Sequence, residues 1–224
     1  MLDVYCIPGM GVNERLFRNL KLDNCNIIHI RWLTPLKNES LPNYASRLAK
    51  QIDTTKPFAL IGVSFGGMCC TEISKKLNPV KTFIVSSSKL HKELPLKISF
   101  FNQLPFYKLF RDGFYKNAVM FAKKQFGVVT AEQKINFRKM LDSAPENYYN
   151  GAVHCIVKWR SDSFPKSIVH IHGTADRVLP YRKVVNCNYT IKGGTHFMII
   201  NKSDEICEII NKELSFLDTI LTAH

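Results

Sequence analysis

Six short apolar runs, most of them continuous rather than alternating, are spread along the 224 residues of the chain. A strand that reads as a continuous apolar run is typical of a parallel sheet covered by helices on both faces. Amphipathic stretches lie between several of these runs, as the connections between parallel strands require. The alternation therefore predicts an α/β fold around one mostly parallel sheet. The expected strands are residues 2–7, 26–32, 58–64, 81–88, 167–173 and 187–193.

Helical spacing of apolar residues marks the segments between and after these strands. Ser203 and Asp204 suit the start of the last helix, because short polar side chains accept hydrogen bonds from the free N–H groups of a helix N-terminus. The expected helices are residues 13–20, 41–52, 65–77 and 203–220.

The alternation of expected strands and helices stops between residue 89 and about residue 150, where proline and glycine divide a segment rich in Phe, Tyr and Leu. We expect several short helices there, forming an apolar cap; the alternative is that they pack beside the sheet. The predicted organisation is an N-terminal part of the core over 1–88, a helical cap insertion over 89–150, and a C-terminal part of the core over 151–224.

Composition restricts the classes of protein that this chain can belong to. With 46% hydrophobic residues it can bury a sizeable core. The formal charge of +13 is dispersed, without the basic stripe and interleaved aromatics of a nucleic-acid-binding surface. No apolar run reaches the roughly 18 residues of a membrane span, and the N-terminus lacks the layout of a secretion signal. We therefore expect a cytoplasmic protein with no nucleic-acid or membrane partner.

The seven cysteines are odd in number, scattered and mostly among apolar neighbours, which indicates reduced, buried side chains. Histidines and cysteines do not occur at metal-ligand spacing, so we expect neither a metal nor a cofactor.

The stretch FALIGVSFGG, residues 58–67, places Ser64 between Gly62 and Gly66 where an expected strand meets an expected helix. That context is typical of a nucleophile elbow, because the glycines permit a tight strand-to-helix turn. A turn without catalytic function is the alternative. A serine nucleophile also requires a neighbouring base and a group that orients the base.

Two downstream motifs supply candidates for those groups. HIHGTADRVLP places Asp176 just after the fifth expected strand, and IKGGTHFMII places His196 just after the sixth. The carboxyl ends of parallel strands meet at one edge of a sheet, so Ser64, Asp176 and His196 are expected to lie close together.

The motifs GVSFGG, HGTAD and GGTHF, in the chain order Ser, Asp, His, resemble those of the α/β-hydrolase superfamily. The stretch IPGMGVNERLF resembles its oxyanion loop, with Pro8 in place of the usual histidine. The resemblance implies that the backbone N–H groups of Met10 and Phe65 bind an oxyanion. It also implies six strands in the spatial order second, first, third, fourth, fifth, sixth, without the two leading antiparallel strands of larger members.

Glu93 is the rival for the acid, since some members of the superfamily place the acid after the preceding strand. Asp176 is favoured because GTAD matches the acid loop, whereas Glu93 follows SSSKLHK in an expected surface segment. His172 is expected to be structural, hydrogen-bonded near the acid, and His170 to be a core or edge residue.

The predicted function is a serine hydrolase that cleaves a carboxylic ester or thioester through an acyl-enzyme. The substrate is a small molecule or is linked to an acidic acyl carrier, a choice that the many cap lysines leave open. The alternatives are a lyase or carbon–carbon hydrolase of the same fold, and a non-catalytic small-molecule-binding protein. The expected apolar pocket residues are Phe106, Tyr107, Phe110 and Phe114, together with Phe100, Phe101 and Tyr115.

Overall fold

The computed structural model describes residues 1–96, 98 and 106–221. Within them, six strands form one sheet in the order β2-β1-β3-β4-β5-β6, and every neighbouring pair is parallel. The predicted α/β class, strand number and strand order are confirmed. The strands are β1 (Leu2–Ile7), β2 (Cys25–His29), β3 (Phe58–Val63), β4 (Lys81–Val85), β5 (Ile168–Gly173) and β6 (Tyr189–Ile191).

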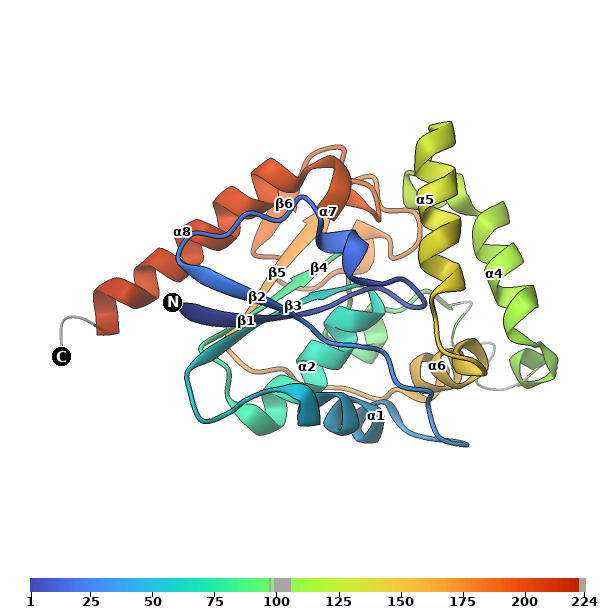
Figure 1. Cartoon of the computed structure of the whole chain (residues 1–224), viewed down its shortest axis with the longest axis horizontal. Coiled ribbons are helices and arrows are strands. Elements are labelled where there is room, and N and C mark those ends of the chain that lie inside the picture. The colour runs from blue at the N-terminus through green and yellow to red at the C-terminus, as the bar shows by residue number, and fades with distance from the viewer. Residues whose placement is uncertain (97, 99–105, 222–224) are drawn as a thin grey trace.

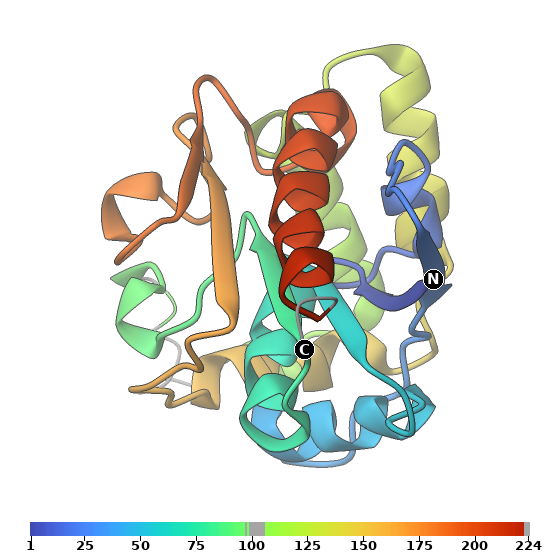
Figure 2. The same ribbon diagram turned by 90° about the vertical axis from the view of Figure 1, so that its left-hand side faces the viewer.

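Helices cover both faces of the sheet (Figure 1). The helices α1 (Leu41–Leu48) and α2 (Phe65–Leu77) lie on one face, and α8 (Ser203–Leu221) crosses the other, as Figure 2 shows from the side. All six residues of β3 are buried between these layers. This double cover is the physical reason why the strands read as continuous apolar runs.

Register brings the loops after four strands to one edge of the sheet. Ile7 at the end of β1 pairs with Gly62 in β3, and Val63 pairs with Val85 at the end of β4. Gly173 at the end of β5 pairs with Ile191 at the end of β6. The motifs that follow β1, β3, β5 and β6 therefore share this edge.

Several expected elements are shorter in the structure. Residues 13–20 form only the 3₁₀ turn η1 (Glu14–Phe17), which suffices to bury Leu16 and Phe17. The strand β4 ends at Val85 because Ser86 adopts a φ of 47°, outside the extended region. Asn186, with a φ of 48°, likewise departs from the extended conformation shortly before β6.

The segment between β4 and β5 is helical and lies beyond the carboxyl edge of the sheet (Figure 1). Its described elements are η3 (His91–Glu93), η4 (Phe106–Leu109), α4 (Asp112–Phe121), η5 (Lys123–Phe126), α5 (Ala131–Asp142) and α6 (Tyr148–Lys158). The remaining elements are η2 (Ala49–Gln51), η6 (Tyr181–Lys183) and α7 (Met198–Asn201).

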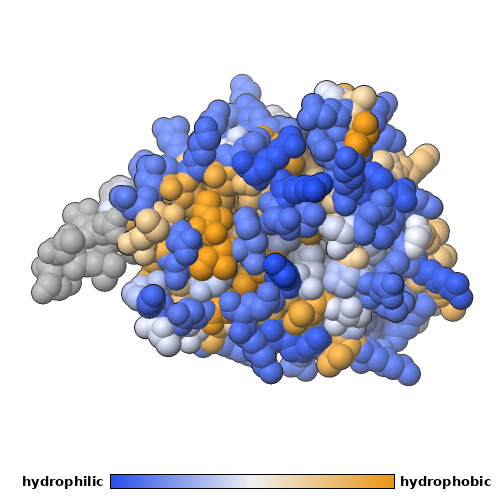
Figure 3. Space-filling model, in the orientation of Figure 1, coloured by the Kyte–Doolittle hydropathy of each residue, from blue (hydrophilic) through white to orange (hydrophobic). Residues whose placement is uncertain are grey.

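Hydrophilic residues cover most of the face seen in Figure 3, and apolar residues gather on it over the outer strand β2. Among the described helices, none is both long enough and apolar enough to cross a bilayer.

Candidate active site

Ser64 occupies a strained backbone position between β3 and α2. Its φ of 53° and ψ of −119° lie in a region that residues other than glycine rarely adopt. Its N–H donates to the carbonyl oxygen of Val85 at 3.0 Å, and the hydroxyl of Ser87 donates to its carbonyl oxygen at 2.6 Å. Such strain persists only where the surrounding structure enforces it, and it is frequent at functional sites.

Glycines make this turn sterically possible. A Cβ on Gly62 would collide with the backbone of Gly66 and Gly67, and a Cβ on Gly66 would collide with the carbonyl oxygens of Ile7 and Pro8. The turn is therefore packed backbone to backbone against the loop that follows β1.

The structure brings Ser64, His196 and Asp176 into one hydrogen-bonded series. His196 Nε2 lies 2.9 Å from Ser64 Oγ, and His196 Nδ1 lies 2.8 Å from Asp176 Oδ2. Asp176 and His196 are both buried, at 5% and 1% exposure. In this arrangement Nδ1–H donates to the carboxylate, which leaves Nε2 free to accept the serine proton.

Three hydrogen bonds and one longer histidine contact hold the Asp176 carboxylate. The N–H groups of Val178 and Leu179 donate to Oδ1 at 2.8 and 2.9 Å. Oδ2 faces His196 and also His172, whose Nε2 lies 3.4 Å away. Burial by itself raises the pKa of Asp176, but the charge of His196 and these hydrogen bonds outweigh it and hold the pKa well below its ordinary value. Asp176 is thus a fixed anion behind His196.

Met10 and Phe65 both border the cavity that contains Ser64. Phe65 is the first residue of α2, where the backbone N–H has no partner inside the helix. In the described part of the chain, the N–H groups of Met10 and Phe65 have no hydrogen-bond partner. Two free donors therefore accompany Ser64.

A cavity of about 740 Å³ opens at Ser64 and His196 and extends under the helices between β4 and β5. The described residues that line it include no Asp, Glu, Lys or Arg. The four expected pocket residues all line it: Phe106, Tyr107, Phe110 and Phe114. Tyr115 does so as well, whereas Phe100 and Phe101 lie outside the described residues. The cavity suits an uncharged, apolar group.

Glu93 is not the surface residue that the sequence predicted. It is 1% exposed and accepts hydrogen bonds from the N–H groups of Lys89, Leu90 and Val185. Because these bonds engage both carboxylate oxygens, Glu93 joins the segment after β4 to the one before β6. Lys89, the first residue of the expected cap and one of its lysines, is also buried, with 1% exposure.

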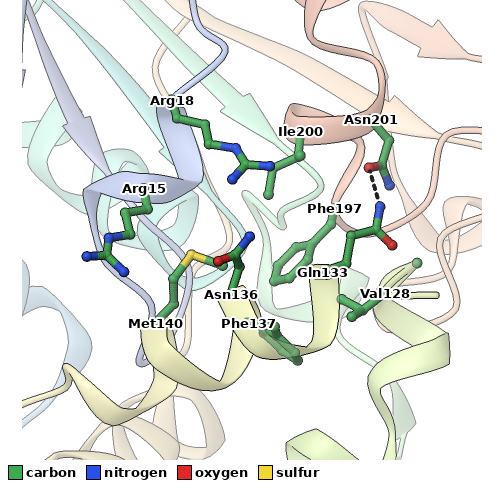
Figure 4. Close-up of a pocket in the computed structure, with 11 residues that line it drawn as sticks. Arg15, Arg18, Val128, Gln133, Asn136, Phe137, Met140, Phe197, Ile200 and Asn201 are labelled. Atoms are coloured by element: carbon green, nitrogen blue, oxygen red, sulfur yellow. Dashed lines mark hydrogen bonds between the residues drawn. The ribbon is translucent and has the colours of Figure 1, made fainter. Parts of the chain in front are cut away.

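A second cavity, of about 70 Å³, lies between α5 and the core (Figure 4). Arg15 of η1 and Arg18, which follows η1, line it on one side, and on the other Gln133 donates to Asn201 at 3.5 Å. Ser64 does not line this cavity, which adjoins the one at Ser64 across Phe137 and Phe197. Among the residues that the structure describes, no three His, Cys, Asp or Glu side chains gather as a metal site would require.

Solved structures identify the fold. The chain superposes on a thermophilic esterase from Thermogutta terrifontis with a TM-score of 0.73 and 16% identity, covering 96% of this chain and 90% of that one. MenH from S. aureus gives a TM-score of 0.69 at 15% identity, with 97% and 94% covered. ClbQ from the colibactin NRPS/PKS pathway gives 0.65 at 14% identity, with 98% and 99% covered.

The chain therefore has the α/β-hydrolase fold, in a form whose sheet has six parallel strands in the described residues. No protein-family model matches the sequence, and no curated protein matches it.

Proposed function

We propose that this protein is a serine hydrolase that cleaves carboxylic esters or thioesters with an apolar acyl group. The observation that carries the proposal is the 2.9 Å contact between Ser64 Oγ and His196 Nε2 at the opening of an uncharged cavity of about 740 Å³. The carboxylate that such a pair requires lies behind the histidine, at 2.8 Å.

In the proposed reaction, Ser64 Oγ attacks the carbonyl carbon while His196 Nε2 takes the hydroxyl proton. The histidine then returns this proton to the leaving alcohol or thiol, and an acyl-enzyme remains. Water, activated by the same nitrogen, hydrolyses the acyl-enzyme. Asp176 keeps the Nδ1–H tautomer of His196 and stabilises its cation.

The negative charge that develops on the carbonyl oxygen needs donors that are already in place. The free N–H groups of Met10 and Phe65 are suited to this role. Preorganised donors of this kind are typically worth about 3 kcal/mol each in transition-state stabilisation. Both belong to the backbone, so Pro8 in place of a histidine does not remove them.

A neighbouring groove indicates the chemical class of the leaving group. It has a volume of about 630 Å³ and shares Val119, Phe126 and Val178 with the catalytic cavity. Arg177 and Arg182 border it, and neither has a partner among the described residues. Two unpaired guanidinium groups beside an apolar floor favour a leaving group with a phosphate, as in an acyl carrier.

A fluorophosphonate probe tests the proposal most directly, because it reacts with an activated serine whatever the natural substrate. We expect labelling of the wild type and of the control Ser163→Ala, whose serine is exposed, and none of Ser64→Ala. A folded wild type that resists labelling would exclude the activated serine.

Turnover then separates the reaction classes. Aryl esters and thioesters of graded acyl length are expected to react faster as an apolar chain fills the cavity. A labelled enzyme that hydrolyses none of them would instead point to the lyase or carbon–carbon hydrolase alternative. Labelling absent from a protein that binds apolar ligands would point to a binding protein.

The carrier is tested by comparing acyl-coenzyme A with the same acyl group on N-acetylcysteamine, which lacks phosphate. Arg177→Ala and Arg182→Ala are expected to lower kcat/KM for the first substrate and to spare the second. Equal effects on both substrates would show that the arginines do not bind phosphate.

A further inference from the structure

A line of buried side chains leads from Lys89 to the acid of the candidate triad. Lys89 Nζ lies 3.1 Å from His170 Nδ1, and His170 Nε2 lies 3.0 Å from His172 Nδ1. His172 Nε2 in turn lies 2.8 Å from the carbonyl oxygen of Leu179 and 3.4 Å from Asp176 Oδ2. Lys89 is 1% exposed and both histidines are fully buried. Burying a lysine is costly, which calls for a physical reason.

The protons along this line can be assigned by chemistry. A carbonyl oxygen only accepts, so the Nε2 of His172 that faces Leu179 carries a hydrogen. In a neutral His172, Nδ1 is then an acceptor, which requires His170 Nε2 to donate. His170 Nδ1 is left to accept, and it faces the Lys89 amine. A protonated His172 would reverse this order and turn a His170 N–H toward an ammonium that cannot accept.

Lys89 supplies the donor that begins the series. Its Nζ faces three acceptors: His170 Nδ1 and the carbonyl oxygens of Val185 and Asn186. An ammonium has three N–H groups, so it satisfies all three, whereas a neutral amine has only two. Burial lowers the pKa of Lys89, but the nearby charge of Glu93 acts in the opposite direction and favours the ammonium.

We propose that Lys89 is a positioning residue for the Ser64–His196–Asp176 triad and acts through His170 and His172, whose tautomers it fixes so that His172 donates toward Asp176. This inference rests on the proposed function of that triad. The Asp176 oxygen that His172 faces is the same one that accepts from His196. The position of this oxygen sets the orientation of the His196 ring.

The cation also disfavours protonation of His170. Burial, then the charge of Lys89, then His172 hold the pKa of His170 well below its ordinary value. Without Lys89, His170 becomes easier to protonate, and no ammonium then holds His170 Nδ1 as an acceptor, which is the arrangement that lets His172 donate from Nε2. The titratable groups in contact with the pair are Lys89 after β4, Asp176 and Tyr181 after β5, and Cys187 before β6. Glu93 and His196 lie one step further, against Lys89 and Asp176 respectively.

The wild-type protein provides the first test, by ¹⁵N NMR of its histidine rings. We expect His170 and His172 to be neutral Nε2–H tautomers at about pH 7. An Nδ1–H tautomer or an imidazolium at His172 would overturn the inference. This test needs no substrate and no variant, so its result stands even if the triad has another function.

The second test compares Lys89→Met with Lys81→Met. Lys81 lies at the start of β4, the strand that precedes Lys89, and pairs with Glu213 at 2.7 Å, away from the triad. We expect Lys89→Met to lower the rate of fluorophosphonate labelling about tenfold near pH 7, corresponding to the loss of one charge-assisted hydrogen bond. The deficit should shrink as the pH rises and His170 becomes neutral.

Lys81→Met should alter the rate less than about twofold, because its ion pair with Glu213 is at the opposite end of β4 from the triad. An unchanged rate in folded Lys89→Met, or the same loss at every pH, would reduce Lys89 to a structural residue. If Lys89→Met does not fold, the tautomers of the wild type decide the question. Absence of labelling in every protein, wild type included, would count against the proposed hydrolase. It would not count against the hydrogen bonds that join Lys89, His170 and His172.

Discussion

The phenol of Tyr149, in α6, lies against Gly11 in the loop that follows β1. Its oxygen is 2.9 Å from the carbonyl oxygen of Leu141 and 3.3 Å from that of Gly11. Gly11 has a φ of 71°, and a Cβ there would collide with the tyrosine ring. A helix from between β4 and β5 thus braces the loop that carries Met10.

Removing this hydroxyl should loosen that loop. We expect Tyr149→Phe to lower the free energy of unfolding by about 1 kcal/mol, the typical net value of one hydrogen bond. It should also slow fluorophosphonate labelling severalfold. Tyr189→Phe is the control, because the Tyr189 hydroxyl donates to Glu213 at 2.7 Å, away from the loop. If both variants label at the wild-type rate, the brace does not affect the oxyanion donors.

The close packing of Gly66 leads to a second prediction. In Gly66→Ala the new methyl group meets the carbonyl oxygens of Ile7 and Pro8, which are backbone atoms that cannot turn aside. We expect a loss of several kcal/mol in denaturant unfolding, or no folded protein. Gly113→Ala in α4 is the matched control, since a Cβ there meets nothing within 4 Å. It should leave the stability unchanged or raise it by about 0.5–1 kcal/mol.

The two candidate acids should separate by kinetics and stability. Asp176→Asn should lower turnover by about 10⁴-fold with little change in fold, because an amide cannot hold the His196 tautomer or stabilise its cation. Glu93→Gln should mainly lower stability, by roughly 1–3 kcal/mol, because an amide NH₂ would face backbone donors. Initial rates and urea unfolding of both variants measure this contrast. The opposite assignment of the two effects would make Glu93 the acid.

His170 makes stability depend on pH. Its folded-state pKa is lowered, first by burial, so the unfolded chain binds more protons below about pH 6.5 and stability falls as the pH decreases. The loss should approach about 1.4 kcal/mol per pH unit for this group while it stays neutral in the folded state. His170→Gln should reduce that slope. Urea unfolding at pH 5 and pH 6.5 gives the change in the free energy of unfolding with pH for each protein. The same change in the wild type and in His170→Gln would contradict the assignment.

The fold could be predicted because its signal is local. Most strands are continuous apolar runs, which can be recognised from neighbouring residues alone. The chain order of these runs and the resemblance to the α/β-hydrolase superfamily then predicted the order of the strands in the sheet. The three triad motifs follow strands whose ends meet at one edge, so Ser64, Asp176 and His196 could be grouped before any coordinates were known.

The burial of Lys89 and Glu93 could not be predicted, because their partners come from a distant segment. The carbonyl oxygens of Val185 and Asn186 accept hydrogen bonds from the Lys89 ammonium, and the N–H of Val185 donates to the Glu93 carboxylate. Nothing near residue 89 indicates this. The sequence did contain one sign of the histidine contact. His170 and His172 are two residues apart on a strand, so their side chains lie on the same face of the sheet.

The walls of the cavity at Ser64 come from Met68 on the core and from Val119 and Ile156 on the helices between β4 and β5. A ligand held between both parts binds the folded chain and not the unfolded one. Occupancy is therefore thermodynamically linked to folding, and a saturating apolar ligand should raise the melting temperature. At a hundredfold excess over the dissociation constant, the linkage amounts to about 2.7 kcal/mol. Thermal-shift screening of apolar acids could thus identify the acyl group without a measurement of catalysis.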